Sequence, residues 1–112
     1  MEDKFLGKID SVRFGLGGYQ DSMLGLHISF VGTGWGVCTS DSTWDYETVK
    51  CSKYAKWTEE DRTELMVKTL KNVSKYLKEA KVSSVDKLKG IPVEVTFENN
   101  TIKSWRILTE VL

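Results

Sequence analysis

One helix-forming segment separates two groups of strand-forming segments in this chain of 112 residues. The helix signal begins at Thr58, a favourable N-cap residue, and three acidic residues follow it in the first turn, where negative charge is stabilising. Asp61 takes the place of the usual Glu or Gln of a capping box. Apolar residues then recur at spacings of four and three: Met66, Leu70, Val73, Leu77 and Ala80. This period predicts a helix of about six turns whose apolar stripe packs against a sheet.

Strands are expected on the N-terminal side of this helix. Over residues 24–30, apolar residues alternate with small or polar ones, which is the period of a strand with one buried face. Shorter apolar patterns predict further strands around residues 9–14 and 35–37. The glycine-rich stretches at residues 15–22 and 32–37 supply the turns, because glycine adopts positive φ without steric cost.

A hairpin is expected on the C-terminal side. Pro92 suits the start of a strand, and Val93, Val95 and Phe97 alternate with polar residues after it. The dipeptide at 99 and 100 is Asn-Asn, and asparagine tolerates the left-handed backbone of a two-residue turn. The returning strand is expected over residues 101–111.

This order of elements, β-β-β-α-β-β, predicts an α+β fold. Its antiparallel sheet has about five strands, and one long helix packs across one face. The chain length suits a single domain over residues 1–112. Strand order cannot be read from the pattern, and a partly rolled, barrel-like sheet is an alternative because short antiparallel strands can close on themselves.

Composition gives little indication of a partner. Sixteen basic and sixteen acidic side chains cancel, so global charge favours neither nucleic acid nor a membrane surface. The N-terminal residues lack the apolar core of a signal peptide, and no apolar run could span a membrane. Cys38 and Cys51 are too few for a disulfide framework. We therefore expect a cytosolic protein with two free thiols and no contact with a membrane.

Residues 40–57 are predicted to form a long loop rich in aromatic residues. The segment has no sustained period of 2 or 3.6, yet it carries Trp44, Tyr46, Tyr54 and Trp57 among polar residues. Such loops are often functional, and tryptophan and tyrosine dominate interface hot spots and stack on bases. The alternative is an aromatic lid that closes one end of the sheet. Tyr19 and Trp35, which lie in the glycine-rich turns, complete the predicted partner-binding residues.

No pattern of catalytic or metal-binding residues is visible. His27, the only histidine, lies within a predicted strand, and a hydrogen-bonded structural role suits it better than acid–base catalysis. The cysteines and His27 lack the spacing of zinc ligands, and the glycine-rich segments do not match a phosphate-binding loop. We therefore expect a protein that is not an enzyme and has no metal or cofactor.

The predicted helix also carries a basic ridge opposite its apolar stripe. The ridge consists of Lys68, Lys71, Lys75 and Lys78. These lysines could contact nucleic-acid phosphates or an acidic protein surface, although a solvated helix face is the simpler explanation.

Five stretches, in this order, resemble a family of small proteins encoded by tailed phages, prophages and related mobile elements. They are GGYQD (17–21), GWGV (34–37), KWTEEDR (56–62), GIPVEVTFENN (90–100) and SWRILTEVL (104–112). The resemblance covers nearly the whole chain and is poorest over residues 39–51. It implies a phage context, with the cytosol of the bacterial host as the location, and assigns no catalytic residues.

Phage accessory proteins of this size commonly disarm bacterial defence, as anti-CRISPR proteins and nucleotide-signal sponges do. The resemblance therefore suggests a non-enzymatic inhibitor whose partner is a host defence protein. Two alternatives remain open. One is a sponge for a nucleotide second messenger, formed as a homo-oligomer, and the other is a single-stranded nucleic-acid-binding accessory of phage replication or recombination.

Overall fold

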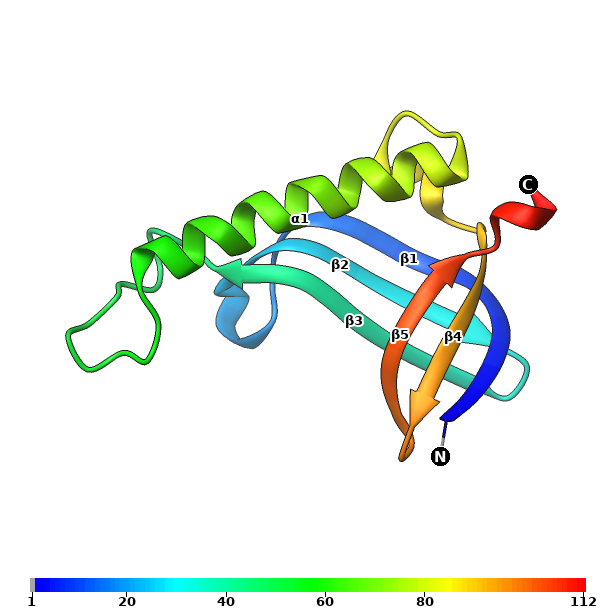
Figure 1. The fold of residues 1–112 in the computed structure, drawn as a ribbon, viewed down its shortest axis with the longest axis horizontal. Helices are drawn as coiled ribbons and strands as arrows, with labels where there is room; N and C mark the ends of the chain where they lie inside the picture. Colours follow the sequence, from blue (N-terminus) through cyan, green and yellow to red (C-terminus); the bar gives the residue numbers. More distant parts are fainter. Residues whose placement is uncertain (1) are drawn as a thin grey trace.

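A computed structural model describes residues 2–112 and contains one antiparallel sheet with one α-helix across it (Figure 1). The strands are β1 (Glu2–Gly17), β2 (Met23–Gly32), β3 (Trp35–Trp44), β4 (Pro92–Glu98) and β5 (Thr101–Ile107), and the helix is α1 (Glu59–Ala80). Three short 3-10 segments are η1 (Tyr19–Asp21), η2 (Val85–Leu88) and η3 (Thr109–Val111). The predicted α+β class and the order β-β-β-α-β-β are confirmed, and the strand order in space is β3-β2-β1-β4-β5.

The long first strand belongs to two halves of the sheet. Residues 2–8 of β1 pair with β4, whereas residues 8–17 pair with β2. The register with β2 shifts between Ile9 and Ser11, so Asp10 is the extra residue of a bulge. Bulges bend a strand and increase its twist. The β4–β5 hairpin accordingly lies at a steep angle to β2 and β3 in Figure 1, and β3 and β5 stay at opposite edges.

The predicted hairpin turn after β4 is also confirmed. Asn99 and Asn100 have φ of 53° and 64°, and Glu98 pairs with Thr101 across them. Positive φ at both central residues is the requirement of a type I′ turn, which explains why asparagine stands at both positions.

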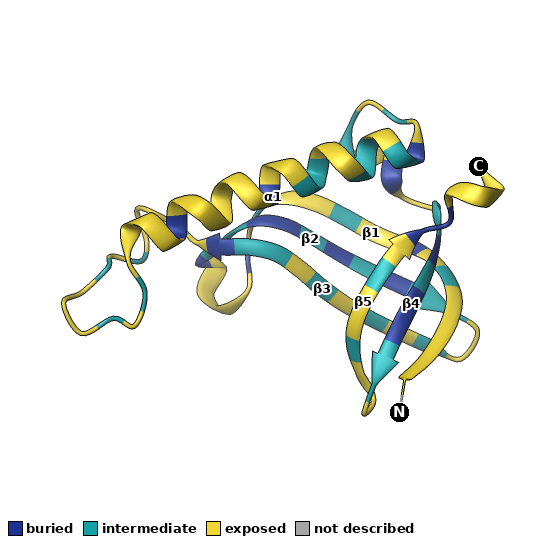
Figure 2. Ribbon diagram, in the orientation of Figure 1, coloured by how far each residue is buried: buried dark blue, intermediate teal, exposed yellow. Residues whose placement is uncertain are grey.

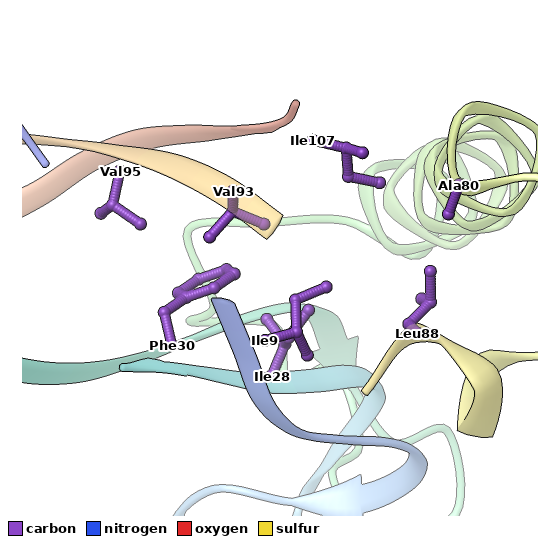
Figure 3. Close-up of a cluster of buried hydrophobic side chains, with 8 residues drawn as sticks. All are labelled: Ile9, Ile28, Phe30, Ala80, Leu88, Val93, Val95 and Ile107. Atoms are coloured by element: carbon purple, nitrogen blue, oxygen red, sulfur yellow. The ribbon is translucent and has the colours of Figure 1, made fainter. Parts of the chain in front are cut away.

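The hydrophobic core lies between the bend of the sheet and the C-terminal half of α1 (Figure 3). Its buried side chains are Ile9, Ile28, Phe30, Ala80, Leu88, Val93, Val95 and Ile107. Leu88, from η2, is fully buried opposite the end of the helix. Trp105 extends this core, because its ring centroid is 4.9 Å from Phe30 and 4.6 Å from Tyr76 of α1.

The helix begins as expected but buries a different face. Thr58 and Asp61 form the capping box, with distances of 2.8 Å and 3.1 Å for its two hydrogen bonds. The predicted apolar stripe is wrong at its N-terminal end, because Met66 and Leu70 are 38% and 61% exposed while Thr69 is buried. Figure 2 shows most of this half of α1 exposed.

A polar contact with β3 explains this rotation of the helix. Asp41 accepts hydrogen bonds from Thr69 Oγ1 (2.8 Å) and Asn72 Nδ2 (2.6 Å). Hydrogen bonds to a charged group are stronger than neutral ones, so this contact directs Thr69 and Asn72, and not Met66 and Leu70, toward the sheet.

The predicted start of the long loop is wrong, because β3 is longer than expected. Residues 40–44, expected in the loop, continue β3 as far as Trp44. Asp41 pairs with Leu26 and Thr43 pairs with Leu24, so both lie on the side of β3 that faces α1. Polar residues on this buried face hide the strand period in the sequence, and the loop is left with residues 45–58.

Among residues 2–112, no helix combines the length and the apolar character needed to cross a membrane.

Candidate binding surface

The β3–α1 loop and the turn between β1 and β2 lie together at one end of the molecule. Asp45 N donates to Ser22 O at 2.7 Å, and Trp44 pairs with Met23. Tyr19, in η1, lies three residues before Ser22 and is therefore close in space to the start of the loop. In Figure 1 both segments lie at the left, beside the N-terminus of α1 and far from the β4–β5 hairpin. We call residues 19–22 and 44–57 the aromatic end.

Arg62 of α1 holds the loop against the helix. The side chain is only 2% exposed, and its Nη2 donates to Val49 O at 2.7 Å and lies 3.0 Å from Glu59 Oε1. Its Cζ lies 4.5 Å from the ring centroid of Trp57 and 5.5 Å from that of Tyr46, distances typical of cation–π contacts. Within the described chain, Nε and Nη1 have no hydrogen-bond partner. The two aromatic rings thus partly replace the water that a buried guanidinium loses.

Hydrogen bonds within the loop add to its order. Asp45 Oδ2 accepts from Thr48 N (3.0 Å) and Thr48 Oγ1 (2.7 Å), and these bonds hold the pKa of the Asp45 carboxyl below its ordinary value. The thiol of Cys51 donates to Trp57 O at 3.2 Å, across the base of the loop. These contacts explain how a segment without helix or strand keeps a defined shape.

Four of the six predicted partner-binding residues are exposed at the aromatic end. Tyr19 and Tyr54 are 79% and 82% exposed, Tyr46 is 59% exposed and Trp44 is 40% exposed. Trp57 is half-buried because one face of its ring contacts Arg62. Trp57 therefore packs internally, whereas the other rings reach solvent.

Trp35 lies elsewhere. It begins β3 at the opposite end of the sheet, where its ring centroid is 6.3 Å from Phe5 and 5.6 Å from Phe97. Gly32 admits the indole, because a Cβ there would lie 2.3 Å from its Nε1. Trp35 is half-buried against the core and separate from the other five residues.

The structure also exposes apolar residues that the sequence placed in the core or assigned to strands. Phe14, Leu24, Met66 and Leu70 line a groove of about 200 Å³ between β1 and α1. Leu16, two residues beyond Phe14 on β1, is also exposed. The apolar stripe of the helix was visible in the sequence, but its direction depends on the contact of Asp41 with Thr69 and Asn72. We call the groove lined by Phe14, Leu24, Met66 and Leu70 the β1 groove.

His27 lies in a separate polar groove on the other face of the sheet. Its Nε2 donates toward Gly15 O (3.2 Å) and Met23 O (3.1 Å). A Cβ on Gly17 would lie 2.8 Å from this ring, so Gly17 makes room for it. The groove, of about 440 Å³, also contains Arg13, Cys38 and the hydroxyls of Ser11, Ser29 and Ser40.

No carboxylate of the described residues lines this groove. His27 and Cys38 are therefore brought into one groove without the acidic partner that would orient an imidazole as a general base. The hydrogen bonds to two carbonyls give His27 the structural role expected from the sequence.

The lysine ridge is exposed along α1. Lys68, Lys71, Lys75 and Lys78 all reach solvent, and among residues 2–112 no ion pair involves them. Lys68 also borders a groove of about 290 Å³ between α1 and β3, together with Asn72, Tyr76 and Trp105. The ridge begins about 15 Å along α1 from the loop, because Lys68 lies ten residues after Thr58 and a helix rises 1.5 Å per residue.

Within residues 2–112, no three His, Cys, Asp or Glu side chains are close enough together to hold a metal ion.

Comparisons of the chain with protein-family models, curated proteins and solved structures find no match.

Proposed function

We propose that this chain is a phage-derived, non-enzymatic binding protein that inhibits a bacterial defence protein by occupying part of its surface. The observation that carries the proposal is the group of exposed rings at the aromatic end: Tyr19, Trp44, Tyr46 and Tyr54. Tyrosine and tryptophan contribute large contact areas with few rotatable bonds, which makes them the most common hot-spot residues of protein interfaces.

The order of the loop supports this proposal. Ordering a flexible loop on binding costs free energy, and a loop already held in place avoids much of that cost. Arg62 supplies this restraint through Val49, Trp57 and Tyr46. The loop is therefore suited to present Tyr54 and Trp44 to a partner in a defined arrangement.

The phage context rests on the resemblance of the sequence stretches, and the mode of action rests on the surface. Inhibition by occlusion needs a stable scaffold and an exposed contact surface, and it needs no catalytic groups. The lack of a carboxylate beside His27 and Cys38 is compatible with such a mode.

Affinity capture tests the proposal with a matched pair of double variants. Tyr19→Ala with Tyr54→Ala removes the two most exposed rings of the aromatic end, neither of which contacts Arg62. Leu6→Ala with Val111→Ala removes two exposed apolar side chains elsewhere, which are 67% and 65% exposed in the wild-type protein. We expect the wild-type and control proteins to capture the same defence component from a bacterial lysate, and the tyrosine variant to lose it. Equal capture by all three folded proteins would contradict the proposal.

The polar groove favours a second candidate function, binding of a nucleotide signal. Arg13 lies in it beside several hydroxyls, and a guanidinium with hydroxyl donors suits phosphate groups. Thermal-shift measurements with cyclic dinucleotides and ADP-ribose derivatives test this candidate, because a ligand stabilises the state that binds it. Stabilisation lost in Arg13→Gln would favour the nucleotide sponge over the protein inhibitor.

The exposed lysine ridge favours the third candidate, single-stranded nucleic-acid binding. Four lysines without ion pairs among residues 2–112 could contact phosphates while the rings of the aromatic end stack on bases. Binding to single-stranded DNA that weakens with salt and with Lys71→Gln, Lys75→Gln would support it. No binding at low salt would exclude it.

A further inference from the structure

The C-terminal half of β1 has a free edge. Among residues 2–112, residues 11–17 of β1 pair with β2 on one side, and no segment pairs with them on the other. The last contacts across that side are made by Ile9, which bonds to Gly90 and Ile91 at 2.8 Å and 3.0 Å. Beyond Ile9, the backbone N–H and C=O groups that alternate toward this side are available to another strand.

This edge has few of the features that usually prevent strands from pairing between molecules, although the bulge at Asp10 lies at its start and η2 contacts β1. Proteins protect free edges with proline, inward-pointing charges or covering segments. Residues 11–17 have no proline, and Arg13 is the only charged residue. Its guanidinium folds back over the same strand, since a Cβ on Gly17 would lie 2.7 Å from Arg13 Nη2.

The two outermost strands of the sheet both carry polar or charged side chains. The edge strand β3 carries Cys38, Ser40 and Ser42 on its outer face. The edge strand β5 carries Lys103 and Arg106, which pair with Glu2, Glu98, Glu94 and Glu110. The free half of β1 is therefore better suited than either of them to contact an apolar partner.

The apolar residues beside this edge are left uncovered by the helix. Helix α1 packs mainly on β3 and β2, so Phe14 and Leu16 of β1 remain 46% and 43% exposed. Phe14 lines the β1 groove together with Leu24, Met66 and Leu70, and the lining of this groove is almost entirely apolar. Leu16 lies two residues farther along the same strand. A strand added to β1 would therefore place every second side chain against this groove.

We propose that a second copy of this chain occupies the edge, by antiparallel pairing of β1 with β1 around a two-fold axis. An antiparallel edge is complementary to itself, and a two-fold interface uses the same surface on both copies. With the axis at Gly15, Phe14 lies opposite Leu16 of the second copy, and Arg13 lies opposite Gly17. An axis at Arg13 would instead place two guanidinium groups opposite each other, which is unfavourable.

The side chains of each copy then cover the apolar groove of the other, and the two sheets join into one. Two short edges with a few apolar side chains belong to the smaller interfaces, so we expect a dissociation constant on the order of 10 µM. This dimer goes beyond the proposed function, because it uses the edge of β1 and not the exposed rings of the β3–α1 loop.

Sedimentation velocity tests the dimer, with a matched pair of variants on the same strand. We expect wild-type protein to pass from monomer to dimer between about 1 µM and about 1 mM, a range that spans the expected affinity. Leu16→Lys places a charge on the free edge and should weaken dimerisation at least tenfold. Leu6→Lys changes an exposed leucine on the half of β1 that pairs with β4, and it should leave dimerisation unchanged.

Cross-linking tests the register without depending on a loss of binding. In a protein with Cys38→Ser and Cys51→Ser, the further substitution Gly15→Cys should give a disulfide-linked dimer under mild oxidation. Directly opposed residues of antiparallel strands have Cα atoms about 4.5–5.5 Å apart, which lies within the range of a disulfide. Protein that retains only Cys38, exposed on β3, is the control and should stay reduced.

Several results would overturn the proposal. One is a wild-type protein that stays monomeric over the whole concentration range. Another is an equal effect of Leu16→Lys and Leu6→Lys on dimerisation. The third is a Gly15→Cys protein that does not cross-link faster than the Cys38 control.

Discussion

Arg62 is the single residue on which the order of the β3–α1 loop depends most directly. Replacing it with methionine keeps an unbranched apolar side chain but removes the hydrogen bond to Val49 O and the contacts of the charge with Trp57 and Tyr46. We expect Arg62→Met to lower the free energy of unfolding by about 1–3 kcal/mol. Amide hydrogen exchange of residues 45–57 should accelerate. Arg13→Met, at an exposed arginine, should change neither, and unchanged loop exchange in Arg62→Met would contradict this role.

Two glycines that look alike in the sequence differ in what surrounds them. A Cβ on Gly17 would lie 2.8 Å from the His27 ring and 2.7 Å from Arg13 Nη2, whereas the nearest atoms to a Cβ on Gly36 are 3.7 Å away. Gly17→Ala must displace the imidazole that bonds to Gly15 O and Met23 O. We expect it to cost about 1–3 kcal/mol of unfolding free energy, measured by chemical denaturation. Gly36→Ala should cost less, and equal costs would show that Gly17 is not needed to accommodate His27.

At the level of helices and strands, Asp41 decides which face of α1 meets the sheet. In Asp41→Ala, Thr69 and Asn72 lose the carboxylate that accepts their hydrogen bonds. We expect a loss of about 2–4 kcal/mol in unfolding free energy and faster exchange in the N-terminal half of α1. Asp10→Ala is the control, because Asp10 is exposed in the β1 bulge. A helix that stays fully protected in Asp41→Ala would show that the few apolar contacts of this half are sufficient.

An ion pair between Arg106 of β5 and Glu110 of η3 contributes to the stability of the fold in a way that depends on pH. Arg106 donates to Glu110 at 2.9 Å and 3.1 Å, and it holds the pKa of the Glu110 carboxyl below its ordinary value. Because the pKa is lower in the folded protein, this contribution is present above the ordinary glutamate pKa and is lost as pH falls through the lowered one. We expect an NMR titration to give Glu110 a lower pKa in wild-type protein than in Arg106→Gln. Equal values would exclude the contact in solution.

The sequence predicted those elements whose signals are local. The alternation in β2 and β4, the capping box at Thr58 and the Asn-Asn turn each depend on a few neighbouring residues, and each is confirmed. The extension of β3 to Trp44 and the rotation of α1 depend on Asp41 meeting Thr69 and Asn72, which are 28 and 31 residues away. A contact at this distance leaves no period in the sequence. The aromatic segment was predicted because its composition is a local signal. The restraint by Arg62 depends on contacts between residues apart in sequence, and it was not predicted.

The shape of the whole molecule follows from one strand that serves two half-sheets. Bending β1 at Asp10 brings β4 and β5 over one end of the core, but it leaves the other half of β1 with a free edge. Strand order, and with it this edge, depends on pairing between segments distant in sequence, so neither could be predicted from hydrophobic periodicity. The aromatic end adjoins the free edge at Gly17 and Tyr19, but different side chains carry the two proposals, and they can be tested separately.

A dimer formed through that edge makes the stability of the fold depend on protein concentration. Association stabilises the folded state by mass action, so a protein that dimerises only when folded unfolds at a higher temperature as its concentration rises. We expect the Tm of wild-type protein to rise by several degrees between about 10 µM and about 1 mM, since a gain of about 1 kcal/mol shifts the Tm of a domain this size by about 4–8 °C. Leu16→Lys should lower this concentration dependence, whereas Tyr19→Ala with Tyr54→Ala should leave it intact. A wild-type Tm independent of concentration would mean that the edge of β1 remains free in solution and that the apolar groove beside it stays exposed to water.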